Sequence, residues 1–264
     1  MSTVTSADGT TIAYETLGGG PALILVDGAM CYRDFGPARG LAKTLADSYT
    51  VYIYDRRGRG ESGNTLPWSP AREIEDLAAL LAAAGGSAYL FGCSSGAVLA
   101  ADAANVLPSF TKLALYEPPF IVDDTREPRE PSFVPDIEAM IARDDRSGAL
   151  KKFMRHVGMP SIMVNIMAFT PPWKKLKAVA PTLPYDLRIL GDTGRGVPLD
   201  ADRWSGVTIP AIVMDGGKSP QYMRNAAKAL SEALPKATYR TLPGQTHMVK
   251  ADAVVPAVKE FLGA

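Results

Sequence analysis

Residues 88–104 read AYLFGCSSGAVLAADAA. The apolar run 88–91 predicts a buried strand, and the alanine-rich run 95–104 predicts a helix. Between them lies Gly92-Cys93-Ser94-Ser95-Gly96, a G-x-S-x-G motif at a strand-to-helix junction. Such a tight turn holds the serine in a strained conformation at the edge of a sheet, and its glycines leave room for the neighbouring elements. Ser94 is therefore the predicted nucleophile.

On both sides of this stretch, strands and helices alternate along the chain. Apolar runs such as residues 22–26 are typical of strands that a parallel sheet buries on both faces. Asp8-Gly9 lies between two strand-like runs and predicts a hairpin. The alternation predicts an α/β fold. Strands are expected at 3–6, 11–17, 22–26, 50–54, 88–91, 112–116, 211–214 and 238–242, and helices at about 70–84, 95–104, 220–234 and 251–262.

The alternation stops between residues 118 and 205. This segment holds 11 of the 21 prolines and five of the ten methionines. Its short helical pieces are expected at 136–142, 147–157, 161–167 and 184–190. We therefore divide the chain into a core, residues 1–117 and 206–264, and a helical insertion, residues 118–205.

A second glycine-rich stretch has a different explanation. Gly58-Arg59-Gly60-Glu61-Ser62-Gly63 matches the dinucleotide-binding pattern G-x-G-x-x-G and follows a strand. That pattern must open a helix whose N-terminus binds a pyrophosphate, but Pro67 and Pro70 follow here. A structural loop is the favoured interpretation.

A serine nucleophile needs a base, and the sequence offers two histidines. His247 lies between the last strand and the last helix, where a loop can place it over the sheet edge. His156 lies on a predicted helix inside the insertion and is interpreted as a partly buried structural residue. Chain order and topology favour His247 as the base.

Taken together, the element order, the Ser94 motif and the late His247 resemble the α/β-hydrolase fold. Residues 55–62, DRRGRGES, are similar to the loop after that family's fourth strand. The resemblance covers almost the whole chain apart from the insertion. It implies a mostly parallel eight-stranded sheet flanked by helices, with an inserted helical cap. Fold alone names no substrate.

The resemblance also implies an oxyanion hole made of the main-chain N–H groups of Ala29 and Ser95. Family members often carry His-Gly after the third strand, whereas this chain has Asp27-Gly28. A hole made of backbone groups survives that exchange. The carboxylate of Asp27 must, however, point away from the developing negative charge.

Two carboxylates are candidates for the third member of the catalytic triad. The family's usual acid follows the seventh strand, but Met214-Asp215-Gly216-Gly217-Lys218-Ser219 has a serine at about that place. Glu117 directly follows the sixth strand, where some members carry their acid. Asp215 ends the seventh strand ahead of the glycines. We favour Glu117 over Asp215; a structural ion pair at the start of the insertion is the other interpretation of Glu117.

Apolar residues near the nucleophile and in the insertion are candidates for binding substrate. Methionine repacks around ligands of varied shape, although such clusters are as often simply core. The candidates are Met30, Met163, Met167, Phe169 and Trp173. Cys31 and Cys93 flank the predicted site and are interpreted as unpaired, buried residues.

Composition excludes several classes of protein. Lys and Arg total 28, as do Asp and Glu, so the chain lacks the cationic excess of a nucleic-acid binder. No apolar run approaches the roughly 18 to 20 residues that span a bilayer, and no signal peptide is recognisable. Two cysteines suggest a reducing, cytoplasmic compartment. We expect no metal or cofactor, and either a monomer or a homodimer.

These observations predict a serine hydrolase that cleaves a small-to-medium carboxylic ester or lactone through an acyl-enzyme. The same triad could serve a carbon–carbon bond hydrolase or a hydroxynitrile-type lyase. A non-catalytic receptor for a small ligand on the same scaffold is a further alternative.

Overall fold

The computed structural model describes residues 1–263 and contains an eight-stranded sheet in the order β1-β2-β4-β3-β5-β6-β7-β8. β2 is antiparallel to β1 and β4, and the other neighbours are parallel. The mostly parallel sheet predicted from the sequence is thereby confirmed. The strands are β1 Ser2–Thr5, β2 Thr11–Leu17, β3 Ala22–Val26, β4 Thr50–Tyr54, β5 Ala88–Cys93, β6 Phe110–Tyr116, β7 Ala211–Gly216 and β8 Ala237–Leu242.

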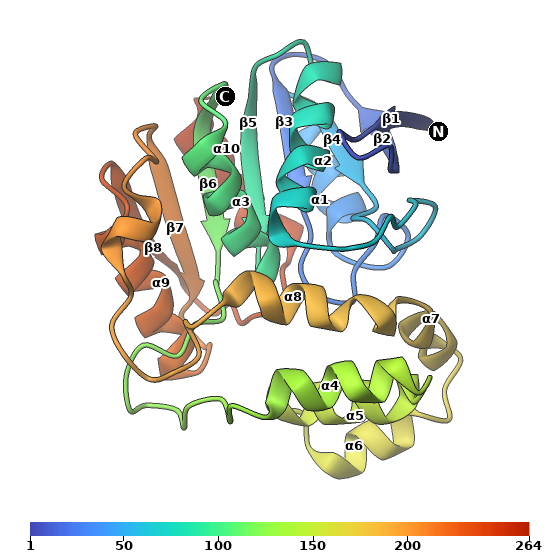
Figure 1. Ribbon diagram of the computed structural model, residues 1–264. Coiled ribbons are helices and arrows are strands. Elements are labelled where there is room, and N and C mark those ends of the chain that lie inside the picture. Colours follow the sequence, from blue (N-terminus) through green and yellow to red (C-terminus); the bar gives the residue numbers. More distant parts are fainter. Residues whose placement is uncertain (264) are drawn as a thin grey trace.

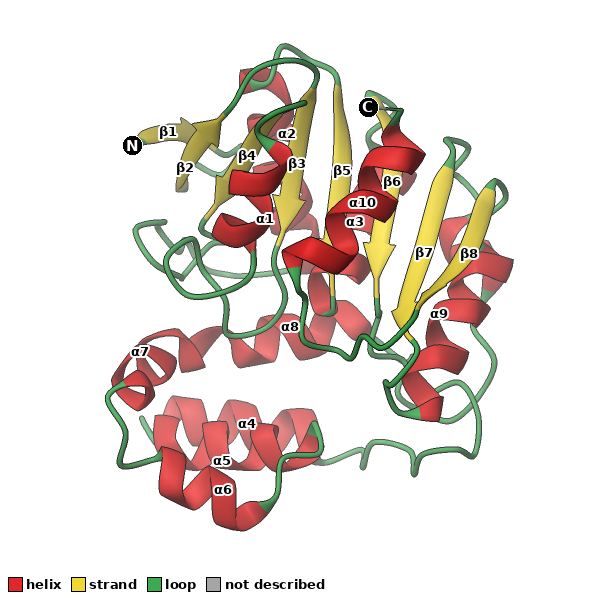
Figure 2. Ribbon diagram, turned by 180° about the vertical axis from the view of Figure 1, so that it is seen from behind, coloured by secondary structure: helices red, strands yellow, loops and turns green. Residues whose placement is uncertain are grey.

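Helices cover both faces of the sheet, as Figures 1 and 2 show from opposite sides. Side chains alternate along a strand, so Leu23 and Leu25 of β3 belong to one core and Ile24 and Val26 to the other. The Leu23 face is covered by α1 (Ala38–Leu45) and α10 (Ala251–Leu262). The Ile24 face is covered by α2 (Pro70–Ala83), α3 (Ser95–Val106) and α9 (Gln221–Ala233).

The segment between β6 and β7 holds a separate group of helices. Its elements are α4 Phe133–Ala142, α5 Arg146–His156, α6 Ser161–Met167, α7 Pro172–Val179, η1 Ala180–Thr182, α8 Leu183–Leu190 and η2 Ala201–Trp204. Residues such as Leu150, Phe153 and Trp173 form an apolar core of its own. α8 lies between the ends of the strands and the helices α4 to α6 (Figure 1).

The sequence did not predict two helices, α1 and α7. The apolar residues of α1, among them Ala38, Leu41 and Leu45, have helical spacing and are buried, but the helix is only eight residues long. In α7, Pro172 occupies the first turn, where a missing N–H costs nothing. Across residues 1–263, no helix combines the length and the apolar character needed to cross a membrane.

Candidate active site

Ser94 occupies the turn between β5 and α3 with φ 56° and ψ −130°. Residues other than glycine rarely adopt this region, which costs about 1–3 kcal/mol and persists only where the surroundings enforce it. The N–H of Ser94 donates to the carbonyl of Tyr116 at 2.9 Å. A Cβ on Gly28 would lie 2.8 Å from the Cβ of Ser94, and one on Gly96 would collide with the carbonyl of Val26. Close packing on both sides therefore holds the strained turn.

His247 and Glu117 come together from two loops at the same edge of the sheet. Nδ1 of His247 lies 2.8 Å from Oε2 of Glu117, whose side chain is fully buried. The other carboxylate oxygen accepts the N–H of Gly216 at 2.6 Å. The hydroxyl of Tyr116 donates to the carbonyl of Thr246 at 2.6 Å and so anchors the histidine loop. His247 keeps 41% of its side chain exposed and lines the same cavity as Ser94.

Asp215, the alternative acid, is engaged elsewhere. Its Oδ2 accepts the hydroxyl of Tyr239 at 2.8 Å and pairs with Nε of Arg224 at 3.2 Å. The Asp215 carboxylate is buried, and these two partners come from β8 and α9. The structure thus brings Glu117, and not Asp215, to His247.

Ala29 and Ser95 both line the cavity that contains Ser94. Ser95 is the first residue of α3, where main-chain N–H groups lack partners within the helix and favour negative charge. Asp27 does not line this cavity. Its Oδ1 lies 3.9 Å from Sγ of Cys93, and burial raises the pKa of Asp27 to about 7. Ala29 and Ser95 therefore share the cavity with Ser94, and Asp27 lies outside it.

Two buried arginines tie the core to the insertion directly beneath the site. Arg56 and Arg59 each place a guanidinium nitrogen 2.7 Å from the carboxylate of Asp186, on α8. Arg59 also donates to the carbonyl of Gly28 at 2.7 Å, and the hydroxyl of Ser95 donates to Asp186 at 2.8 Å. Burial alone would raise the pKa of Asp186, but the charges of Arg59 and Arg56 hold it below the usual value. Arg59, in the glycine-rich loop after β4, thus supports the main chain at Gly28, which packs against Ser94.

The cavity at Ser94 has a volume of about 160 Å³. The insertion contributes helix residues such as Phe153, His156 and Leu187, and the segment after β6 contributes Arg126 and Arg129. The ring of His156 packs on Phe133 with centroids 4.2 Å apart, so this histidine has both a structural contact and a place in the wall. Sequence reasoning missed Arg126 and Arg129 because residues 119–129 have no periodic pattern.

The five apolar residues predicted to bind substrate do not line this cavity. Met163 is 54% exposed, because α6 turns Val164 toward the interior, and Phe169, in the turn after α6, is 93% exposed. Trp173 is buried in the core of the insertion, and Met30 and Met167 pack against that core. A stripe of apolar residues does not by itself reveal which side of a short helix faces a cavity.

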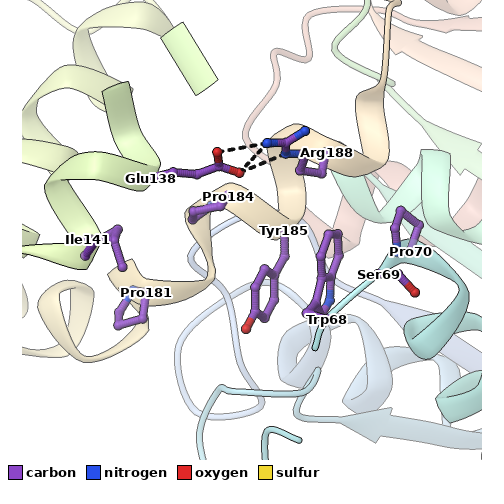
Figure 3. Close-up of a pocket in the computed structure, with 10 residues that line it drawn as sticks. Trp68, Ser69, Pro70, Glu138, Ile141, Pro181, Pro184, Tyr185 and Arg188 are labelled. Carbon is purple, nitrogen blue, oxygen red and sulfur yellow. Dashed lines mark hydrogen bonds and ion pairs between the residues drawn. The ribbon is translucent and has the colours of Figure 1, made fainter. Parts of the chain in front are cut away.

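A larger groove, of about 620 Å³, lies between α2, α4 and α8 (Figure 3). Its wall includes Trp68 stacked on Tyr185 with centroids 4.3 Å apart, and an ion pair between Arg188 and Glu138. Arg188 and Glu138 are paired with each other, and neither Ser94 nor His247 lines the groove. Both candidate catalytic residues line the smaller cavity instead. Within the described residues, no three His, Cys, Asp or Glu side chains are grouped as metal ligands.

Comparison with known proteins identifies the family. A model of the alpha/beta hydrolase family matches residues 18–257. The chain belongs to that family. A crystal structure of an alpha/beta hydrolase from Sphaerobacter thermophilus DSM 20745 has a TM-score of 0.90 and 45% identity, covering 99% of this chain and 100% of that one.

Other similar proteins are more distant. An uncharacterized hydrolase, YraK of Bacillus subtilis (strain 168), is 38% identical over 98 residues, or 36% of this chain. That match spans about a third of the relative's length (35%). An enol-lactonase from Burkholderia xenovorans LB400 has a TM-score of 0.70 and 19% identity, covering all of both chains, which shows a shared fold.

The match to the hydrolase family takes in Ser94, Glu117 and His247. It also takes in the helical segment between β6 and β7, whose α8 carries Asp186. The turn that carries Ser94, the His247–Glu117 pair and the cavity therefore all lie within the matched region.

Proposed function

We propose that the protein is a serine hydrolase that cleaves a small carboxylic ester or lactone through an acyl-enzyme. The observation that carries this proposal is the 2.8 Å contact between His247 Nδ1 and Glu117, at a cavity that Ser94 also lines. A buried carboxylate on Nδ1 selects the tautomer that leaves Nε2 free to accept a proton.

In the proposed mechanism, Ser94 Oγ attacks the carbonyl carbon while Nε2 of His247 takes the hydroxyl proton. Glu117 stabilises the imidazolium, and the N–H groups of Ala29 and Ser95 stabilise the oxyanion. Collapse of the tetrahedral intermediate breaks the C–O bond, and His247 returns the proton to the leaving oxygen. In a lactone this oxygen stays tethered to the acyl group. Water then repeats the sequence and frees Ser94.

The size of the cavity supports a small substrate. Its volume of about 160 Å³ is similar to that of a cavity of roughly 150 Å³ that accommodates benzene. One small ring or a short acyl chain fits such a space. Esterase or lactonase chemistry also agrees with the enol-lactonase among the structural relatives.

The test combines covalent labelling with turnover. A fluorophosphonate probe should add one label to the wild-type protein at Ser94 and none to Ser94→Ala. Wild type should hydrolyse members of a panel of acetyl to octanoyl esters and five- and six-membered lactones. Ser94→Ala should remain folded by circular dichroism and keep at most roughly 10³- to 10⁴-fold catalysis over water.

Other outcomes would select the alternative functions. Wild-type rates in Ser94→Ala would reject a serine nucleophile. Cyanide release from a hydroxynitrile, or cleavage of a vinylogous diketone, without a trapped acyl-enzyme would favour a lyase or a carbon–carbon hydrolase. Tight ligand binding with no turnover of any member of the panel would favour a receptor.

A further inference from the structure

Two arginines line the cavity at Ser94 without an acidic partner. Among residues 1–263, neither Arg126 nor Arg129 has a carboxylate oxygen within 4.0 Å of its side-chain nitrogens. Their hydrogen bonds go to main-chain carbonyls: Arg126 donates to His156, and Arg129 donates to Gly191 at 2.8 Å. A guanidinium has five N–H donors, so both retain donors for a ligand.

Several acidic residues near these arginines are committed to other partners, and Glu127 and Glu130, which flank the arginines in the sequence, are exposed. Asp186, which also lines the cavity, is bound by Arg56 and Arg59. Asp192 forms an ion pair with Arg195 at 2.9 Å. Asp123 accepts the amide of Asn225 at 2.5 Å. Glu117 is bound to His247 and to the N–H of Gly216.

The pKa of His156 is lowered by burial and by the same two arginine charges. Burial, and then the charges of Arg126 and Arg129, lower the pKa of His156 to about 4. His156 is therefore neutral at pH 7 and adds no third charge. Both guanidinium groups line the same cavity as His156, and their charges add to burial in lowering its pKa.

We propose that the substrate of the hydrolase proposed above carries a carboxylate, which Arg126 and Arg129 bind while Ser94 attacks a separate ester or lactone carbonyl. This inference rests on that proposed function. Arginine binds carboxylates through paired N–H groups, which fixes orientation as well as position. The ring of Tyr222, 4.3 Å from the guanidinium of Arg126, holds that side chain in place.

Charge recognition in this cavity has a direct kinetic consequence. Anchoring one end of a small substrate places its other carbonyl against Ser94 and the two main-chain donors. Hydrogen bonds to charged groups are roughly twice as strong as neutral ones. A dicarboxylic half-ester or a carboxylated lactone should therefore be hydrolysed faster than its neutral counterpart of equal size.

The test compares two matched substrates, monomethyl succinate and methyl butyrate. We expect wild-type kcat/KM to be at least about 10-fold higher for the charged ester. Arg126→Gln and Arg129→Gln each keep an amide donor for the main-chain carbonyl but lose the charge. Each should lower kcat/KM for monomethyl succinate by about 10- to 100-fold and leave methyl butyrate within about 2-fold.

Arg188→Gln is the matched control, because Arg188 lies on the insertion, pairs with Glu138 and does not line this cavity. It should leave both rates unchanged. Equal losses on both substrates in the Arg126 and Arg129 variants would mean that the arginines act structurally, and would overturn the inference. Equal wild-type rates on the two esters would overturn it as well.

A binding measurement separates this inference from the proposed reaction. Succinate titrated into Ser94→Ala by calorimetry should bind, and added Arg126→Gln or Arg129→Gln should weaken binding by about 10-fold or more. This result would hold even if Ser94 were not the nucleophile. No detectable binding of succinate, or binding unaffected by both arginine variants, would reject a carboxylate subsite. Loss of turnover in Ser94→Ala on both esters tests the hydrolase mechanism alone.

Discussion

The side chain of Glu117 contacts His247, and that of Asp215 does not. Its two oxygens contact His247 Nδ1 and the N–H of Gly216, so the carboxylate is fixed from both sides. Asp215 is held by Tyr239 of β8 and Arg224 of α9. A carboxylate must lie beside Nδ1 to stabilise the imidazolium, and only Glu117 does so among these two.

We expect Glu117→Gln to lower kcat by about 10²- to 10⁴-fold, because glutamine keeps the size but not the charge that stabilises His247. Asp215→Asn should retain most of the activity. Steady-state rates on one ester, with circular dichroism to verify folding, check both variants. Retained activity in Glu117→Gln together with its loss in Asp215→Asn would move the acid to β7.

Burial raises the pKa of the carboxyl group of Asp27, which has few hydrogen-bond partners. Among residues 1–263, its Oδ2 has no hydrogen-bond partner, and burial raises its pKa from 3.8 to about 7, against the opposing charges of Arg59 and Arg56. The folded state therefore binds a proton that the unfolded state has released between these pH values. Stability linked to Asp27 falls as the pH rises from about 4 to about 7 and then stays level.

Asp27→Asn should remove this dependence, because asparagine keeps the shape and carries no charge. We expect the variant to gain stability relative to wild type as the pH rises from 4 to 7, with a constant difference above that. Urea unfolding at pH 4, 5.5, 7 and 8.5 measures the difference. A difference that does not vary with pH would show that Asp27 is ionised in the folded protein throughout.

Helix α8 is fixed to the core by the carboxylate of Asp186. Arg56, Arg59 and Ser95 converge on this one residue, and all four side chains are buried. Removing one partner of a buried ion pair leaves an uncompensated charge, which costs more than the pair itself contributes. On the outer side of the same helix, Arg188 pairs with Glu138 in partial contact with solvent.

We expect Asp186→Asn to lower the free energy of unfolding by about 3–5 kcal/mol at pH 7. The pKa of Asp186 is lowered in the folded state, so its contribution is present above the unfolded value of 3.8 and is lost as the pH falls below it. Glu138→Gln is the control and should cost little, because water screens its ion pair. Urea denaturation measures both; equal effects would contradict the role assigned to Asp186.

Elements with strong periodicity were predictable from sequence, and contacts between distant elements were not. Apolar runs such as residues 22–26 gave each strand within two residues, and the prediction for α6 matched its bounds. α1 was missed because eight residues give few helical repeats. The bond between Arg59 and Asp186 joins residues 127 positions apart, and nothing in either local sequence indicates that pairing.

The molecule as a whole builds its cavity from parts that the sequence separates. Parallel strands precede Ser94, Glu117 and His247, and the carboxyl ends of such strands share one edge of the sheet. The predicted topology was therefore enough to place the three residues close together. The opposite wall comes from the insertion, and no comparable rule places its side chains. The apolar pattern therefore directed attention to α6, while the structure lines the cavity with residues such as Val157 and Leu190.

The difference between cavity-lining and other apolar residues of the insertion predicts which substitutions change the preference for acyl length. Val157 lines the cavity and is 45% exposed, so Val157→Ala should enlarge the space with little loss of stability. Hydrophobic pockets discriminate by roughly 10-fold or more per methylene. We expect the ratio of kcat/KM for hexanoyl over acetyl esters to rise about 10-fold.

Met163→Ala is the matched control for this change, since it also shortens an apolar residue of the insertion that is 54% exposed but does not line the cavity. It should leave the acyl-length profile unchanged. Kinetics on a series of acetyl, butyryl and hexanoyl esters measure both variants. A shift in Met163→Ala with none in Val157→Ala would mean that α6, and not the end of α5, closes over the acyl chain during turnover.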